Sequence, residues 1–163
     1  MNIRTVLLTC LVAAQPALGQ VPTPNFSGVW VMDTTKFAKH DPVLVALKLT
    51  IKQTGDSLTI VSDIGDQRGG PTGPITKTTT TTPYRLDGKP IQNLMVNGTL
   101  ATNSLAWNHD TLVMVATGTA RDSQTLTITT RWTLDAKRTT LTQQQRMEHG
   151  ARLANQTLLF TKQ

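Results

Sequence analysis

Apolar and polar residues alternate along most of the chain after residue 25. In residues 45–52 one side is apolar and the other carries lysine and threonine; the apolar side consists of Val45, Leu47, Leu49 and Ile51. A period of two is that of a β-strand with one buried face. The same alternation recurs in residues 26–32, 112–117, 125–132 and 139–147. No segment shows the period of a long amphipathic helix, so the pattern predicts an all-β chain.

Short polar turns separate these segments. Thr54–Ser57, Asp87-Gly88 and Asn108–Asp110 carry the glycine, asparagine and aspartate that tight turns favour. Three segments, TIKQTGDSLTI, AWNHDTLVM and RWTLDAKRTTLT, share the order of strand end, aspartate-containing turn and leucine. Repeated hairpins predict an antiparallel up-and-down β-barrel of about eight strands, because closure removes exposed sheet edges. Such a barrel is filled by side chains or holds one small ligand.

Two adjacent stretches depart from the alternation. Residues 64–74 are rich in glycine and proline and are interpreted as a loop. Residues 75–84, ITKTTTTTPY, are polar on nearly both faces, which is typical of an edge strand or a poorly covered wall. Pro83 is expected to end the hydrogen-bonded ladder of this strand, since proline has no backbone N–H.

The first nineteen residues have the features of a secretory signal peptide. Arg4 supplies a positive charge, the apolar run that follows it is too short to span a bilayer, and Ala17 and Gly19 place small residues at the cleavage site. We therefore expect cleavage after Gly19, a secreted or periplasmic protein, and a single barrel domain over residues 20–163. The alternative is a lipid anchor through Cys10.

Composition narrows the choice of partners. The net charge is +6, and the basic residues are spread along the chain rather than clustered. Nucleic-acid binding would need clustered basic residues with stacking aromatics, and aromatic residues make up 4% of the chain. No segment after the leader is apolar for long enough to form a membrane helix. Thirty threonines interleave with leucine, isoleucine and valine, which suits the outer face of a sheet.

Chemistry-bearing motifs are absent from the sequence. His40, His109 and His149 lie far apart without a metal-ligating spacing, so no metal is predicted. Asp63 and Asp66 flank Gly65 and are interpreted as solvated loop residues rather than a catalytic pair. The glycine-rich residues 69–73 lack the ending of a phosphate-binding loop. No cofactor is predicted, and the sequence gives no positive case for an enzyme.

Short motifs give the chain a resemblance to a known family. Phe26-Ser27-Gly28-Val29-Trp30 resembles the Gly-X-Trp start of the lipocalins and the wider calycin group. With Asp87-Gly88-Lys89, Trp107–Leu112 and Arg131–Leu134, most of residues 25–163 is similar to uncharacterised secreted bacterial members of the lipocalin-like family. The resemblance implies a β-barrel that binds a small apolar molecule. It transfers no specific activity, because no second lipocalin motif and no cysteine pair is found.

The resemblance also implies how one end of the barrel closes. Trp30 would fill that end, and a basic side chain from a late strand would pack over its indole. Arg131 and Arg146 are the candidates for this cation, with Arg152 as a third. Gly28 would allow the backbone to bend or another chain to approach closely.

The expected function follows from the barrel. The chain is expected to be an exported, soluble, non-catalytic carrier of a small hydrophobic ligand, with no protein partner indicated. The residues expected to line the site are Trp30, Met32, Trp107, Met114 and Trp132, and packing in the core is the other interpretation of the same side chains. The alternative function is an interaction or structural module with a solid core, acting through residues 75–84 or 64–74. Connected apolar space of roughly 300 Å³ or more separates a carrier from a solid barrel.

Overall fold

The computed structural model describes residues 23–36, 44–67, 72–94, 100–120 and 122–163. The expected signal peptide, Cys10 and His40 lie outside these residues. Within the described ranges there is no helix with the length and apolar character needed to cross a membrane.

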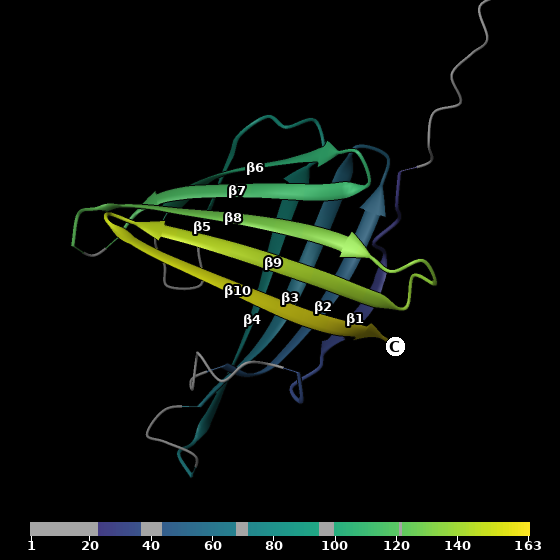
Figure 1. Ribbon diagram of the computed structural model, residues 1–163, viewed down its shortest axis with the longest axis horizontal. Coiled ribbons are helices and arrows are strands. Elements are labelled where there is room, and N and C mark those ends of the chain that lie inside the picture. The colour runs from purple at the N-terminus through teal and green to yellow at the C-terminus, as the bar shows by residue number, and fades with distance from the viewer. Residues whose placement is uncertain (1–22, 37–43, 68–71, 95–99, 121) are drawn as a thin grey trace, which may run out of the picture.

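Ten antiparallel strands form one curled sheet (Figure 1). They are β1 (Gly28–Met32), β2 (Leu44–Thr54), β3 (Ser57–Gln67), β4 (Ile75–Arg85), β5 (Ile91–Leu94), β6 (Leu100–Asn108), β7 (Thr111–Thr119), β8 (Thr125–Leu134), β9 (Thr140–His149) and β10 (Arg152–Lys162). The first strand pairs with the last, so the sheet runs in the order β4-β3-β2-β1-β10-β9-β8-β7-β6-β5. Figure 1 shows the wall of β7–β10 crossing in front of β2–β4. The predicted all-β, up-and-down barrel is confirmed.

The barrel is nearly closed, but backbone hydrogen bonds do not run all the way around it. β4 and β5 are the two ends of the hydrogen-bonded order. Across this seam the side-chain amide of Asn93 donates a hydrogen bond to the carbonyl of Pro83, at 3.4 Å. At the turn after β4, the backbone of Asp87 bridges to Ala106 of β6. Side-chain and turn contacts therefore join β4 to the β5–β6 hairpin where a backbone ladder does not.

The structure has ten strands where about eight were expected. The alternation is weak over residues 91–100, where β5 ends at Leu94 and β6 begins only at Leu100. The expected loop at residues 64–74 is also partly wrong, since β3 continues to Gln67. Gly65 has no side chain, so the alternation of apolar and polar residues in β3 is hard to see in the sequence at this point. A Cβ atom there would lie 3.2 Å from the Cβ of Ala46, so glycine lets β2 and β3 stay close.

Asp63 is accordingly a strand residue and not a loop residue. It lies between Lys48 of β2 and Thr79 of β4 in the register of the sheet. Its carboxylate pairs with the Lys48 ammonium at 2.8 Å and accepts a hydrogen bond from the Thr79 hydroxyl at 2.8 Å. These two hydrogen bonds lower the pKa of Asp63. Asp66 pairs with Thr76 in the same ladder, so the two carboxylates belong to the sheet wall.

β4 is an edge strand, as predicted, but Pro83 does not end it. Pro83 is paired with Thr59 inside the β3–β4 ladder. Its carbonyl accepts the hydrogen bond from Asn93 on the seam side. In an antiparallel strand the N and O atoms of one residue point the same way, so the missing N–H of Pro83 faces the seam and costs no ladder bond.

An aromatic plug, defined here as Phe26, Trp30, Trp107 and Trp132, fills one end of the barrel. Phe26 and Trp30 are fully buried, which confirms that the indole of Trp30 points inward. The Trp30 indole N–H donates to the carbonyl of Phe26 at 2.8 Å. The Phe26 ring stacks on Trp107 with centroids 5.8 Å apart and meets Trp132 edge-on at 6.2 Å. Phe26 thus connects all three tryptophans of the chain.

The cation over Trp30 is Lys162 and not an arginine, which corrects the expectation for Arg131 and Arg146. Lys162 is opposite Trp30 in the β1–β10 register, and its ammonium lies 5.2 Å from the indole centroid. Arg131 and Arg146 are exposed, because their neighbours in β8 and β9 are the ones that point inward. Arg152 is also exposed, opposite His149 at the start of β10.

Gly28 makes the approach of Lys162 possible. Its φ angle is +143°, which side chains other than glycine rarely adopt. A Cβ atom at this position would lie 2.6 Å from the Cε atom of Lys162. The group that lies close to the backbone of Gly28 is thus the side chain of Lys162.

We predict that Phe26→Ala lowers the free energy of unfolding by about 3–5 kcal/mol, because it removes the ring on which two indoles pack. Val31→Ala is the control, since Val31 is 37% exposed. Urea unfolding measures both variants. A loss for Phe26→Ala no greater than that for Val31→Ala would contradict the plug.

We predict that Lys162→Met lowers the free energy of unfolding by about 0.5–1 kcal/mol, because the methylene stem remains while the cation over Trp30 is lost. Arg131→Met should leave the free energy unchanged within error. Chemical denaturation of the two variants in parallel decides between them, and a larger loss for Arg131→Met would reverse the assignment of the cation.

Candidate functional site

The interior of the barrel contains a cavity of about 260 Å³. It borders the aromatic plug, because Trp132 packs against Phe26 and also lines the cavity. Its lining comes from inward-facing positions on eight strands, β2 to β9. The apolar part of the lining is Leu47, Leu49, Ile60, Ile64, Met114 and Ile128. The interior is therefore not completely filled, and the volume of the cavity lies just below the roughly 300 Å³ that separates a carrier from a solid barrel.

The rest of the cavity wall is polar but uncharged. β4 contributes Thr80, Thr82 and Tyr84, so the threonine-rich strand is polar on its inner face because that face lines the cavity. From β8 and β9 come Thr130, Gln143 and Gln145. Burial raises the pKa of Tyr84, which keeps its phenol protonated and able to donate a hydrogen bond. Among the described residues that line the cavity, none is charged.

Two of these polar side chains have no partner in the protein. The Thr130 hydroxyl and the Trp132 indole N–H are buried and make no hydrogen bond within the described structure. Thr130 is 0% exposed and Trp132 is 5% exposed. Leaving such a group unpaired costs about 1–3 kcal/mol. Native proteins pair nearly all buried polar groups with protein atoms or ordered water, so these two atoms of the cavity wall are free to pair with a water molecule or a ligand.

A second hollow of about 690 Å³ lies at the rim where β2 and β4 begin. Its lining includes the apolar Met32, Val45 and Ile75 and also three charged residues, Lys48, Asp63 and Lys77. Leu47 and Ile64 line both the rim hollow and the interior cavity. These two side chains therefore form a shared boundary between the cavity and the rim.

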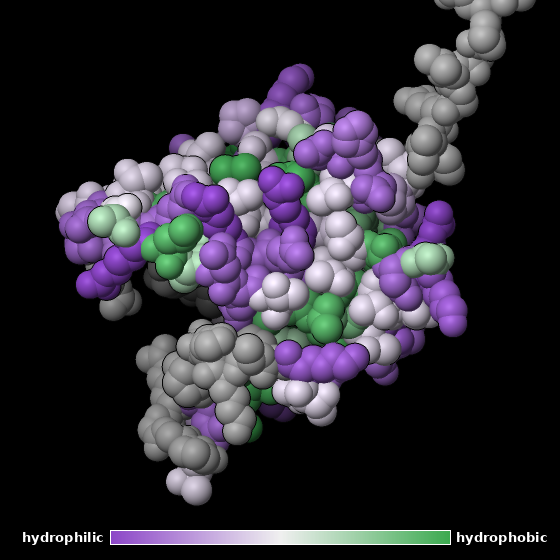
Figure 2. Space-filling model, in the orientation of Figure 1, coloured by the Kyte–Doolittle hydropathy of each residue, from purple (hydrophilic) through white to green (hydrophobic). Residues whose placement is uncertain are grey.

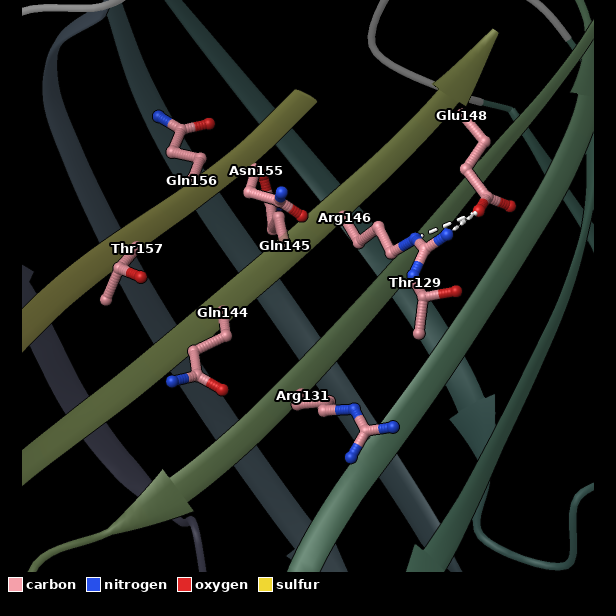
Figure 3. A pocket seen from close by; sticks show the side chains of 9 residues that line it. All are labelled: Thr129, Arg131, Gln144, Gln145, Arg146, Glu148, Asn155, Gln156 and Thr157. Atoms are coloured by element: carbon pink, nitrogen blue, oxygen red, sulfur yellow. Dashed lines mark hydrogen bonds and ion pairs between the residues drawn. The ribbon is translucent and has the colours of Figure 1, made fainter. Parts of the chain in front are cut away.

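The outer face of the barrel offers a third, different surface. Figure 2 shows that the wall formed by β7–β10 is largely hydrophilic on the outside. A polar depression of about 480 Å³ lies across β8–β10, and Figure 3 shows its side chains, including Arg131, Gln144 and Arg146. Arg146 is paired with Glu148 at 2.6 Å, and both side chains are about half exposed. Its ion pair is satisfied and solvated, so the interior cavity is the stronger candidate site.

The predicted ligand-lining residues fall into three places. Met114 and Trp132 line the cavity, Met32 lines the rim hollow, and Trp30 and Trp107 belong to the plug. Sequence reasoning missed the polar residues of the cavity. The alternation along each strand could have identified them, because Thr130 is on the same side of β8 as Trp132 and Gln143 is on the same side of β9 as Leu141. That signal was weak because the run of glutamines at 143–145 is polar on both faces.

The histidines in the described ranges stand apart from the cavity. His149 shares a hydrogen bond with Asp122 at 2.9 Å, and this contact lowers the pKa of Asp122. His109 is exposed in the β6–β7 turn. Over the described residues, no group of three or more histidine, cysteine or carboxylate side chains is placed to hold a metal ion.

Comparison with solved structures identifies the fold. Fatty-acid-binding protein 1 of Echinococcus granulosus matches at a TM-score of 0.56 and 12% identity, over 84% of this chain and 96% of that chain. Lipid binding protein 8 of Caenorhabditis elegans matches at 0.56 and 12% identity, over 85% and 95%. The zebrafish ileal bile acid-binding protein, solved with cholic acid, matches at 0.53 and 13% identity, over 85% and 98%.

The chain has the fold of the fatty-acid-binding proteins. This result supports the calycin-type barrel that the Gly-X-Trp motif suggested. Identities near 12% show the fold and not the ligand. No protein-family model matches the chain, and no curated protein is similar to it in sequence.

We predict that Thr130→Val raises the free energy of unfolding by about 1 kcal/mol, because an unpaired buried hydroxyl is replaced by a methyl of similar size. Thr129→Val is the matched control, since Thr129 is the adjacent residue of β8 and lines the outer depression. Thermal and urea unfolding of the purified variants measure the change. Destabilisation by Thr130→Val would mean that its hydroxyl is already well paired.

Proposed function

We propose that this protein is an exported, non-catalytic carrier that holds one small, largely hydrophobic molecule inside its barrel. The observation that carries the proposal is the interior cavity, whose wall is apolar over β2, mostly apolar over β3, and contains two unpaired polar groups on β8. Export rests on the leader in residues 1–19. Solved proteins of the same fold are named for fatty acids, lipids and bile acids, which supports a ligand of this class.

The size of the cavity sets the size of the molecule. A volume of 260 Å³ corresponds to about nine water-sized atoms at liquid density. This is slightly below the range of ligand pockets, which begins near 300 Å³. The adjoining rim hollow provides further apolar surface beyond Leu47 and Ile64. A ligand with a short apolar chain would fill the cavity, and a longer chain would extend into the rim hollow.

Native mass spectrometry tests the proposal directly. The protein is purified from its own source without detergent, its intact mass is compared with that of the same protein after organic extraction, and the extract is analysed for lipids. A mass difference matched by an extracted apolar molecule is the expected result. A protein whose mass does not change on extraction, and which also takes up no added amphiphile, would overturn the proposal.

We predict that Met114→Trp abolishes uptake of a small amphiphile, because the larger ring occupies the cavity that Met114 lines. Val115→Trp is the matched control: Val115 is the next residue of β7, is also half-buried, and points to the other face. Binding is followed by calorimetric titration, and unfolding curves confirm that both variants fold. Equal binding by the two variants would place the ligand outside the barrel.

A further inference from the structure

We propose that the polar group of the ligand is an uncharged hydrogen-bond acceptor, such as the oxygen of a ketone, ester or alcohol, and that it binds at Thr130 and Trp132. This inference rests on the proposed carrier function and specifies the chemistry of its ligand. It follows from which polar atoms are unpaired, from the absence of charge around them, and from where the apolar wall lies.

The unpaired atoms define what the ligand must offer. The indole N–H of Trp132 can only donate, so its partner must be an acceptor. The Thr130 hydroxyl can donate or accept. The two residues are two positions apart on β8, so their side chains face the same side of the sheet. Their Cα atoms are about 7 Å apart along the strand. A single oxygen-bearing group at this point of the wall has access to both.

Neighbouring side chains extend this polar region. In the β8–β9 register, Thr130 lies opposite Gln145 and Trp132 lies opposite Gln143. All four line the cavity. The glutamine amides can donate or accept, so they adapt to the ligand, and the indole sets the requirement for an acceptor.

The lack of charged side chains in the cavity lining disfavours a carboxylate on the ligand. A buried carboxylate without a cation is strongly disfavoured, because the loss of its hydration is not repaid. The described lining of the cavity contains no lysine or arginine. Arg131 and Arg146 lie on the outer face, and Lys162 lies over Trp30 within the plug region. Lys48 and Lys77 line the rim hollow, at the opposite end of the cavity from Trp132. The lining contains no acidic side chain either, which disfavours an ammonium group for the same reason.

The apolar wall orients the molecule. Trp132 adjoins the aromatic plug, whereas Leu47 and Ile64 adjoin the rim hollow. Leu49, Ile60 and Ile128 lie among the cavity-lining residues as well. A ligand with its oxygen at Trp132 therefore extends its chain along Leu49 and Ile60 toward the rim. The polar end is innermost and the apolar end is nearest to the rim.

The experiment compares probes of similar size that differ in charge. Calorimetric titrations at neutral pH use 2-octanone, 1-octanol and octanoate with the full barrel domain. We expect both neutral probes to bind about ten-fold or more tightly than octanoate. Tighter or equal binding of octanoate would overturn the inference while leaving the carrier function intact. Failure of all three probes to bind would overturn the carrier function itself.

Variants locate the oxygen. Trp132→Phe keeps an aromatic ring against Phe26 and removes the N–H, and Thr130→Val removes the hydroxyl. Each should weaken 2-octanone by about ten-fold, whereas Thr129→Val should leave its affinity unchanged. Thr130→Val is expected to fold with raised stability, so its loss of binding cannot be ascribed to unfolding. If both variants bound 2-octanone with wild-type affinity, the assignment of Thr130 and Trp132 as partners of the ligand oxygen would be wrong.

Discussion

The contacts of Phe26 determine how this barrel is closed. Phe26 precedes β1, yet its ring meets Trp107 of β6 and Trp132 of β8, and its carbonyl accepts the hydrogen bond of Trp30. One residue thus joins strands that share no ladder. Because β4 and β5 are not paired, the backbone hydrogen bonds do not complete the circle. The aromatic plug supplies contacts across the barrel that a continuous ladder would otherwise provide.

Beyond the plug, the interior changes from filled to hollow. Leu58, Leu112, Leu141 and Phe160 are almost fully buried and pack in the core with the plug. Elsewhere in the interior, inward positions on β4, β8 and β9 are threonine, tyrosine and glutamine, which leave space and offer hydrogen bonds. A barrel selected for stability alone would fill this space with apolar side chains. The unpaired groups on β8 therefore cost stability, and under the proposed function a bound ligand would offset that cost.

Arg131 and Arg146 show that the direction of a side chain depends on whether its position along the strand is odd or even. Arg131 and Arg146 were candidates for the cation over Trp30 because they lie on late strands. In the folded chain they are one residue away from positions that point inward, and so they line the outer depression with Glu148. Lys162 occupies the inward position opposite Trp30, at the last residue of β10. A shift of one residue along a strand separates a core partner from a surface charge.

The period of two in the sequence predicted the all-β architecture. The resemblance of the Gly-X-Trp start placed Trp30 inside the barrel, and the polar composition of residues 75–84 indicated an edge strand or a poorly covered wall. These properties are local, because the alternation of side chains is set by the backbone of each strand. The cavity was decided only by the tertiary structure. Whether Thr130, Gln143 and Gln145 face solvent, solid core or open space depends on which strands stand opposite across the barrel. That arrangement comes from the pairing of β1 with β10 and from the plug, both of which join residues more than 80 positions apart in the chain.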